Sequence, residues 1–340
     1  MILNPWVIAM YVSLLGMSAL YLYAWFISFQ IVKRWDASSM EDGQLILERR
    51  SHLAATIIQY GFWIQVMSLV LFYMALESVS ELIPGAMCAT GSLQANTFGF
   101  PSLFVKVAVT ILCVLWLSLH HVDSRLEDYR LTPLKFKCLL FLAPLVVVDL
   151  VFQFFYFVNL DPEIISSCCG VVFEIEGKGL GASVASLPAS PMMIAFYGAV
   201  PFLLLVGMVF ARKATPWGYY TYTGLGILFF LLSVLAIISF MSPYVYEAPT
   251  LHCPFCLMRQ EYNYIGYPLY LLLFGAFLFS LLPGLFELLK RKGTVVSQVV
   301  RGLQRKALHI SLVLWALFVF VPTLIIVFYE MRSGAGYLFG

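Results

Sequence analysis

Two cysteines separated by two residues form the sharpest chemical signal in this sequence. They occur in the segment Cys253-Pro254-Phe255-Cys256. A Cys-x-x-Cys spacing brings two thiols within reach of one another and favours the thiolate form of the more exposed one. Pro254 suits the first turn of a helix, because a proline lacks only an N–H that has no partner there. We therefore expect a helix to begin near Cys253, whose thiolate the helix dipole would stabilise.

Three chemical roles fit this pair of thiols. A redox dithiol would exchange with a thiol protein through a mixed disulfide. A structural disulfide would only close the loop that carries it. Two thiolates would also form half of a metal site, and thiolate ligands select soft metals such as Cu(I) and Zn(II). The redox role is the leading hypothesis, and the other two stay open.

The composition indicates a protein that crosses a membrane several times. Of the 340 residues, 61% are hydrophobic and 11% are charged, whereas about a quarter of an average soluble chain is charged. The formal net charge is +2, so no strong overall field attracts nucleic acid, and we expect no nucleic-acid partner. These values exclude disordered chains, collagens and coiled coils, and they argue against a soluble enzyme.

Eight apolar stretches approach the length of about 20 residues that a helix needs to span the hydrocarbon core. They cover residues 5–31, 54–76, 103–119, 138–158, 192–210, 219–240, 267–289 and 308–328. We therefore predict an all-α polytopic membrane protein with eight transmembrane helices. It should form one integral membrane domain over residues 1–340, without a separate soluble domain.

The basic residues predict the orientation of these spans. Most of the 20 Lys and Arg residues lie in one alternating set of connections, and cytoplasmic loops are enriched in these residues. Both termini should therefore lie outside, with the first span as an uncleaved helix. The loops at about 79–102, 160–190 and 242–266 should lie on the extracytoplasmic face of a bacterial-type inner membrane. Lys106, inside the third span, is expected to snorkel outward or to pair with Glu77.

These three outer loops contain five of the seven cysteines. Each loop has an acidic residue six or seven positions before a cysteine, with a proline between them. This similarity favours three tandem helical hairpins plus two flanking helices, and we expect the loops to gather their cysteines. Adjacent cysteines rarely bond to each other, so Cys168 and Cys169 should pair with different partners or bind a soft metal together. The cysteines in these loops are Cys88, Cys168, Cys169, Cys253 and Cys256.

A carboxylate in the middle of a predicted span is the second chemical signal. Asp149 lies in the stretch 138–158, and Gln153 shares its helix face at a spacing of four residues. A carboxylate at that depth is costly unless it is paired or protonated. We expect Asp149 to relay protons or to bind a quinone head group, with Gln153 on the same face. The alternative is a protonated Asp149 that forms a hydrogen bond to a neighbouring helix, through Gln59 or Gln65 of the second span.

The segment 253–259 reads Cys-Pro-Phe-Cys-Leu-Met-Arg and resembles the segment that opens a transmembrane helix in DsbB-type membrane disulfide oxidases. In those proteins an Arg near a bound quinone follows the Cys-x-x-Cys, one residue further away than Arg259 is here. The resemblance implies that Cys253 and Cys256 face a quinone that Arg259 contacts. It also implies a second pair, Cys88 with Cys168 or Cys169, that passes electrons from a partner protein. The vitamin K epoxide reductase family is similar in this respect. Both this family and the membrane disulfide oxidases are built on four-helix bundles.

These observations lead to one functional hypothesis and two alternatives. We expect a membrane thiol–disulfide oxidoreductase that passes electrons between an extracytoplasmic thioredoxin-like or thiol protein and a quinone in the lipid bilayer. The first alternative is a transporter or delivery protein that binds a soft metal (copper, zinc or mercury) through the outer cysteines. The second is a non-enzymatic membrane subunit whose disulfides are only structural.

Overall fold

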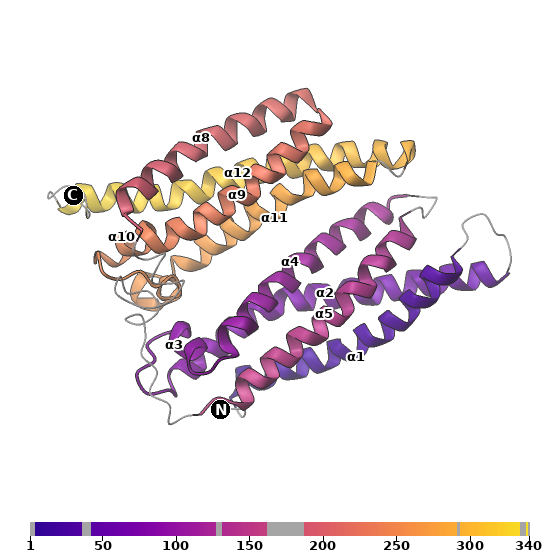
Figure 1. The fold of residues 1–340 in the computed structure, drawn as a ribbon, viewed down its shortest axis with the longest axis horizontal. Coiled ribbons are helices and arrows are strands. Elements are labelled where there is room, and N and C mark those ends of the chain that lie inside the picture. The colour runs from indigo at the N-terminus through magenta and orange to yellow at the C-terminus, as the bar shows by residue number, and fades with distance from the viewer. Residues whose placement is uncertain are drawn as a thin grey trace. The chain divides into compact units, whose positions relative to one another are not determined.

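The computed structural model describes residues 4–35, 42–126, 131–161, 187–290, 293–333 and 338. The described residues form helices joined by turns, without a strand (Figure 1). The long helices are α1 (Pro5–Arg34), α2 (Asp42–Ser80), α4 (Gly99–Asp123), α5 (Thr132–Val158), α8 (Ala189–Lys213), α9 (Pro216–Ala236), α11 (Gly266–Lys290) and α12 (Thr294–Ser333). The short elements are α3 (Ala89–Gln94), the π-helix η1 (Ile237–Met241), α10 (Ser242–Tyr246) and the 3-10 turns η2 (Cys256–Met258) and η3 (Gln260–Tyr262).

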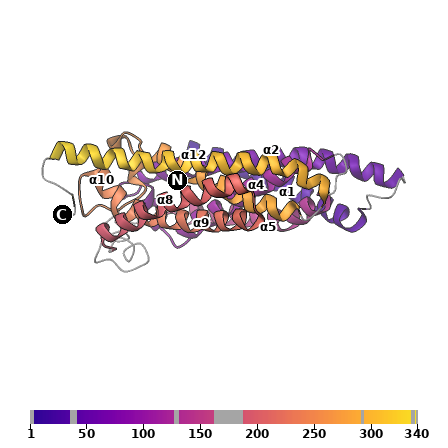
Figure 2. The same ribbon diagram turned by 90° about the horizontal axis from the view of Figure 1, so that it is seen from above.

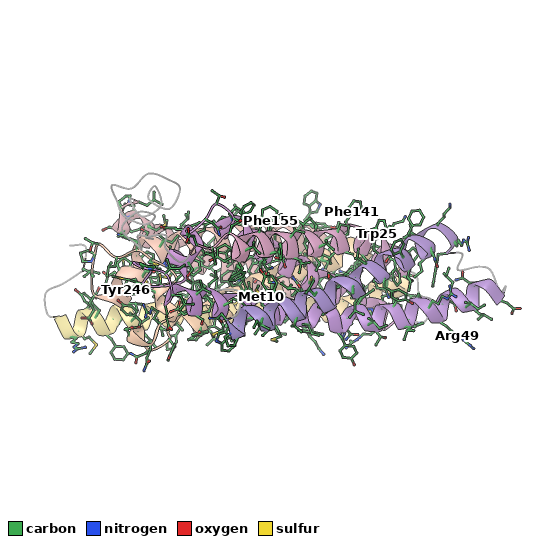
Figure 3. All side chains as sticks on the ribbon, turned by 90° about the horizontal axis from the view of Figure 1, so that it is seen from below. Met10, Trp25, Arg49, Phe141, Phe155 and Tyr246 are labelled. Carbon is green, nitrogen blue, oxygen red and sulfur yellow. The ribbon has the colours of Figure 1, made fainter. Side chains whose placement is uncertain are left out.

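Eight helices in the described part of the chain are long and apolar enough to cross a membrane, which confirms the predicted number. Each predicted stretch lies within one of them, the sixth within the continuous helical segment Pro216–Tyr246. Large apolar side chains are also exposed on these helices: Leu271 is 76% exposed and Phe141 is 78% exposed. Figure 3 shows Phe141 projecting from the helices. Such surfaces are compatible with lipid as the surrounding solvent. The chain is therefore a multi-pass helical protein suited to a bilayer.

The chain divides into two compact units, and the first comprises Met1–Ser166 with Lys292–Val299. Within it α1 packs against α2 and α5, and α4 packs against the same two helices, so the four helices close into a bundle. They run along one another, as Figures 1 and 2 show. Aromatic rings fill part of the core: Phe62 stacks on Tyr21 with ring centroids 5.2 Å apart and meets Trp116 edge-on at 4.9 Å.

The second unit comprises Ser167–Arg291 with Val300–Gly340. Here α9 packs against α8 and α11, while aromatic contacts attach α12 to α8 and α9. Phe229 of α9 meets Trp315 of α12 at 4.8 Å, and Phe196 of α8 meets Phe318 of α12 at 6.2 Å. The spans thus group four and four. The orientation in the membrane and the three tandem hairpins stay predictions.

Small residues let α9 and α11 approach closely. A Cβ atom on Gly226 would lie 2.5 Å from the Ser280 hydroxyl oxygen, and one on Gly284 would lie 2.7 Å from the Thr223 hydroxyl oxygen. Thr223 Oγ1 also donates to the Ser280 carbonyl at 2.9 Å and accepts the Gly284 N–H at 3.0 Å. Small residues and interhelical hydrogen bonds of this kind are the usual basis of helix association in membranes.

This close approach predicts a difference between two glycines of one helix. Gly226→Val should lower the free energy of unfolding by about 1–3 kcal/mol, because the added side chain overpacks the contact with α11. Gly224→Val is the matched control: Gly224 is exposed, and nothing lies within 4 Å of its Cβ position. Thermal unfolding in detergent would measure both variants. Equal shifts in the two variants would contradict the packing described here.

Candidate functional site

Cys253 and Cys256 lie in the loop between α10 and α11 of the second unit. Their Sγ atoms lie within 4.8 Å of one another, as the Cys-x-x-Cys spacing predicts. Cys253 is buried, with 1% of its surface exposed, whereas Cys256 is partly exposed. The pair therefore combines one thiol that another molecule can reach with one that is protected behind it.

Two tyrosines from the flanking helices hold the backbone of this loop. The Tyr246 hydroxyl donates to the Cys253 carbonyl at 2.5 Å, and the Tyr270 hydroxyl donates to the Pro254 carbonyl at 2.9 Å. Both tyrosines also lie within electrostatic reach of the two thiols. The Tyr246 ring packs against Tyr262 with centroids 4.3 Å apart. Because both anchors come from helices, the helical scaffold fixes the position of the cysteines.

His252 provides a third anchor through the π-helix of the same unit. Its Nδ1 lies 2.9 Å from the carbonyl oxygen of Ile238, within η1. A carbonyl only accepts, so Nδ1 carries a proton, and in the neutral imidazole Nε2 is then the nitrogen with the lone pair. That Nε2 is buried and has no hydrogen-bond partner among the described residues. π-Helical turns often occur at functional sites, and this one fixes the residue directly before Cys253.

The prediction that a helix begins near Cys253 is wrong. The first helical turn after the pair is the 3-10 turn Cys256–Met258, and α11 begins only at Gly266. Asn263 and Tyr264 adopt the left-handed conformation, with φ of 53° and 55°, and reverse the chain before α11. Pro254 therefore belongs to a folded loop and not to the first turn of a membrane helix.

Arg259, the predicted quinone contact, follows the pair in the same loop. Its Nε lies 3.3 Å from Glu261 Oε2, and the two side chains are 31% and 60% exposed. An ion pair with this much exposure contributes only about 0–1 kcal/mol. The guanidinium therefore keeps its charge partly exposed, in the same loop as the cysteines.

The remaining predicted cysteines are Cys88, Cys168 and Cys169. Cys88 lies in the first unit, directly before α3, and is fully buried. The Glu77 carboxylate accepts the N–H of Ala89 at 3.2 Å and so holds the start of that short helix. Cys168 and Cys169 lie outside the described residues.

Asp149 lies at the centre of a buried polar cluster in the first unit, here called the Asp149 cluster. Its Oδ2 accepts from Gln65 Nε2 at 2.7 Å and from Lys106 Nζ at 3.0 Å, and its Oδ1 accepts from Gln153 Nε2 at 2.6 Å. All four residues are 0% exposed. The predicted bond to Gln65 of the second span is confirmed, whereas Gln59 contacts His120. A carboxylate that accepts three donors matches its ionised form.

Lys106 corrects an expectation drawn from the sequence. It neither snorkels outward nor pairs with Glu77, because its ammonium group forms a fully buried salt bridge to Asp149. Opposite charges attract far more strongly in a low-dielectric interior than at a surface. The ammonium group therefore remains in the core, where it neutralises a carboxylate that would otherwise be costly to bury.

Comparisons with known protein families, with curated protein sequences and with solved structures find no match to this chain. The resemblance of segment 253–259 to membrane disulfide oxidases is therefore a likeness of one motif. Function must be argued from the geometry of the two sites themselves.

The salt bridge predicts unequal effects of single and double substitutions. Lys106→Met or Asp149→Leu alone should lower the free energy of unfolding by about 3–5 kcal/mol, because each leaves one buried charge unpaired. The double variant should be close to the native chain, because two apolar side chains replace the whole pair. Thermal unfolding in detergent measures all three. A double variant less stable than either single variant would contradict the pairing.

Proposed function

We propose that this protein is a membrane thiol–disulfide oxidoreductase in which Cys253 and Cys256 alternate between dithiol and disulfide. The observation that carries the proposal is the pair itself: two thiols within 4.8 Å, one buried and one partly exposed. Two tyrosine hydroxyls that hold the loop add support, because catalytic groups need a fixed geometry. The pair lies at one end of a unit with four long helices, and the families that the motif resembles are also built on four-helix bundles.

The difference in exposure assigns a role to each sulfur. When the pair is oxidised, a thiolate of the partner protein attacks Cys256 Sγ, and Cys253 leaves as a thiolate. A second partner thiolate then attacks the partner's own sulfur in the mixed disulfide and releases Cys256. The partner gains a disulfide and the pair gains two electrons. A membrane quinone would take these electrons with two protons and become a quinol.

The remaining parts of the proposal follow from the sequence. The distribution of Lys and Arg favours an inner (plasma) membrane protein with both termini and the cysteine loops outside. Three tandem hairpins would place Cys88, Cys168 and Cys169 in loops on that same face, where one pair would receive electrons from a thioredoxin-like protein. Arg259 is the proposed quinone contact, because a quinone carbonyl needs a donor and Arg offers several N–H groups. Asp149 and Gln153 remain the second proposed quinone contact, and in their cluster Gln65, Lys106 and Gln153 are the donors to the Asp149 carboxylate.

Binding of a soft metal is the second candidate function. Two thiolates within 4.8 Å suit Cu(I), which prefers sulfur ligands. The buried Nε2 lone pair of His252 adds an imidazole to the same loop. Purified protein would then contain stoichiometric copper or zinc that Cys253→Ser removes.

The redox proposal predicts a reversible disulfide. Differential alkylation and mass spectrometry of native membranes, equilibrated across a series of potentials, should show Cys253 and Cys256 titrating together between about −300 and −120 mV. Cys253→Ser should abolish this titration. Cys138→Ser is the control, since Cys138 is an exposed thiol on α5, and it should leave the titration unchanged.

Two other results would overturn the proposal. A disulfide that stays oxidised well below about −300 mV would be a structural bond. Thiols that resist alkylation until a chelator is added would indicate a metal site, and metal analysis of the same sample would identify the ion.

A further inference from the structure

Four side chains that can exchange a proton lie on the core side of α4, among apolar residues such as Val109 and Leu117. Lys106, Cys113, His120 and Asp123 follow at spacings of 7, 7 and 3 residues, which places them on one face of the helix. His120 is partly buried, and the other three are at most 2% exposed. At 1.5 Å per residue, the row covers about 26 Å along the helix axis. Each of these side chains can give or take a proton.

A second polar cluster, the His120 cluster, lies at the C-terminal end of α4. The His120 Nδ1 lies 3.4 Å from Lys135 Nζ, and its Nε2 lies 3.2 Å from Gln59 Oε1. An ammonium only donates and an amide oxygen only accepts, so the imidazole is neutral with its proton on Nε2. Lys135 also donates to Asp123 at 2.5 Å. A neutral imidazole between a donor and an acceptor has the arrangement through which histidine transfers protons.

The Asp149 cluster, in contrast, has hydrogen-bonding capacity left over. Lys106 has three N–H donors, and the structure gives it one acceptor, Asp149. The Oε1 atoms of Gln65 and Gln153 are buried without a partner among the described residues. The charge of Lys106 disfavours a bound cation, and the carboxylate and amide oxygens disfavour an anion. Water, which both donates and accepts, is the ligand that fits these groups.

Two groups lie between the clusters. Cys113 and Tyr21 of α1 both belong to the buried core of this unit, and Cys113 is within electrostatic reach of Lys106, Asp149 and Tyr21. The Tyr21 hydroxyl is buried without a partner among the described residues. From Cys113 to His120 the helix rises by about 10 Å. Trp116 occupies this interval and stacks on the His120 ring with centroids 5.4 Å apart.

We propose that the core of the first unit is a proton-exchange path with water as its ligand, joining the His120 cluster to the Asp149 cluster along α4. Each transfer breaks one N–H, O–H or S–H bond and forms another, so it needs no oxidant. The path is independent of Cys253 and Cys256 and stands whether or not that pair is redox-active. If the pair is redox-active, such a path is one source of the protons that quinone reduction consumes.

The Cys113 thiol is a natural probe of this path. Its S–H stretch absorbs in a region of the infrared spectrum that other protein groups leave clear, and the difference from Cys113→Ser assigns it. After transfer of the full-length protein into D2O, the native Cys113 band should convert to S–D within minutes. His120→Phe keeps a ring against Trp116 but removes the group that relays protons. If D2O then reaches Cys113 only by local unfolding of the core, the exchange should slow by at least about tenfold. His120→Gln keeps hydrogen bonds but cannot relay a proton, so it should also slow the exchange.

The neighbouring histidine supplies the control. His121 is exposed on another face of α4, and His121→Phe should leave the exchange of Cys113 unchanged. Loss of stability would accelerate exchange, so slower exchange in the His120 variants cannot result from poor folding. Unchanged or faster exchange in both His120 variants, or equal slowing by His121→Phe, would overturn the proposal.

Discussion

A buried carboxylate has to be neutralised, and this constraint organises the first four-helix unit. Asp149 of α5 accepts from Gln65 of α2 and from Lys106 of α4, so one side chain joins three helices. Ion pairs that remain in an apolar interior fix the register of the elements that supply them, because any slip leaves a charge alone. The salt bridge and hydrogen bonds of Asp149 therefore favour one arrangement of these helices, in addition to the packing of their aromatic rings.

The helices of the second unit pack through a different kind of contact. Its helices meet through rings such as Phe229 and Trp315 and through the close approach of Gly226 to Ser280, without a charged pair in the middle of its described helices. Its polar contacts concentrate at one end, where Tyr246 and Tyr270 bind the cysteine loop. One unit thus places ionisable groups along its core, and the other presents two thiols at the end of a rigid bundle. The proposed oxidoreductase would use both kinds of chemistry.

Much of this arrangement could be predicted from the sequence, and the errors have physical causes. The apolar stretches of the sequence located all eight membrane-length helices, because a stretch of about 20 apolar residues has few stable conformations other than a membrane-spanning helix. The position predicted for Lys106 was wrong because the sequence of one helix does not show which residue of the neighbouring helix lies opposite. Lys106 lies about 10 Å from the start of α4, while Asp149 lies about 13 Å from the end of the adjacent α5, so their depths match. The start of α11 was misplaced because Pro254 predicts a helix locally, whereas the left-handed Asn263 and Tyr264 delay it.

The reaction of Cys256 with a partner protein tests the central claim most directly. Thiol–disulfide exchange is reversible, so the reduced Cys256 thiolate of Cys253→Ala can attack the disulfide of the oxidised partner and displace one partner thiolate. Cys253, which would complete this reverse transfer by attacking Cys256, is gone, so a mixed disulfide between Cys256 and an extracytoplasmic dithiol protein should accumulate in native membranes. Mass spectrometry after alkylation, with and without reductant, would show a disulfide-linked peptide that contains Cys256. We expect this adduct in Cys253→Ala and its absence in Cys256→Ala. An equal yield from the two variants, or no adduct in either, would contradict a redox role for the pair.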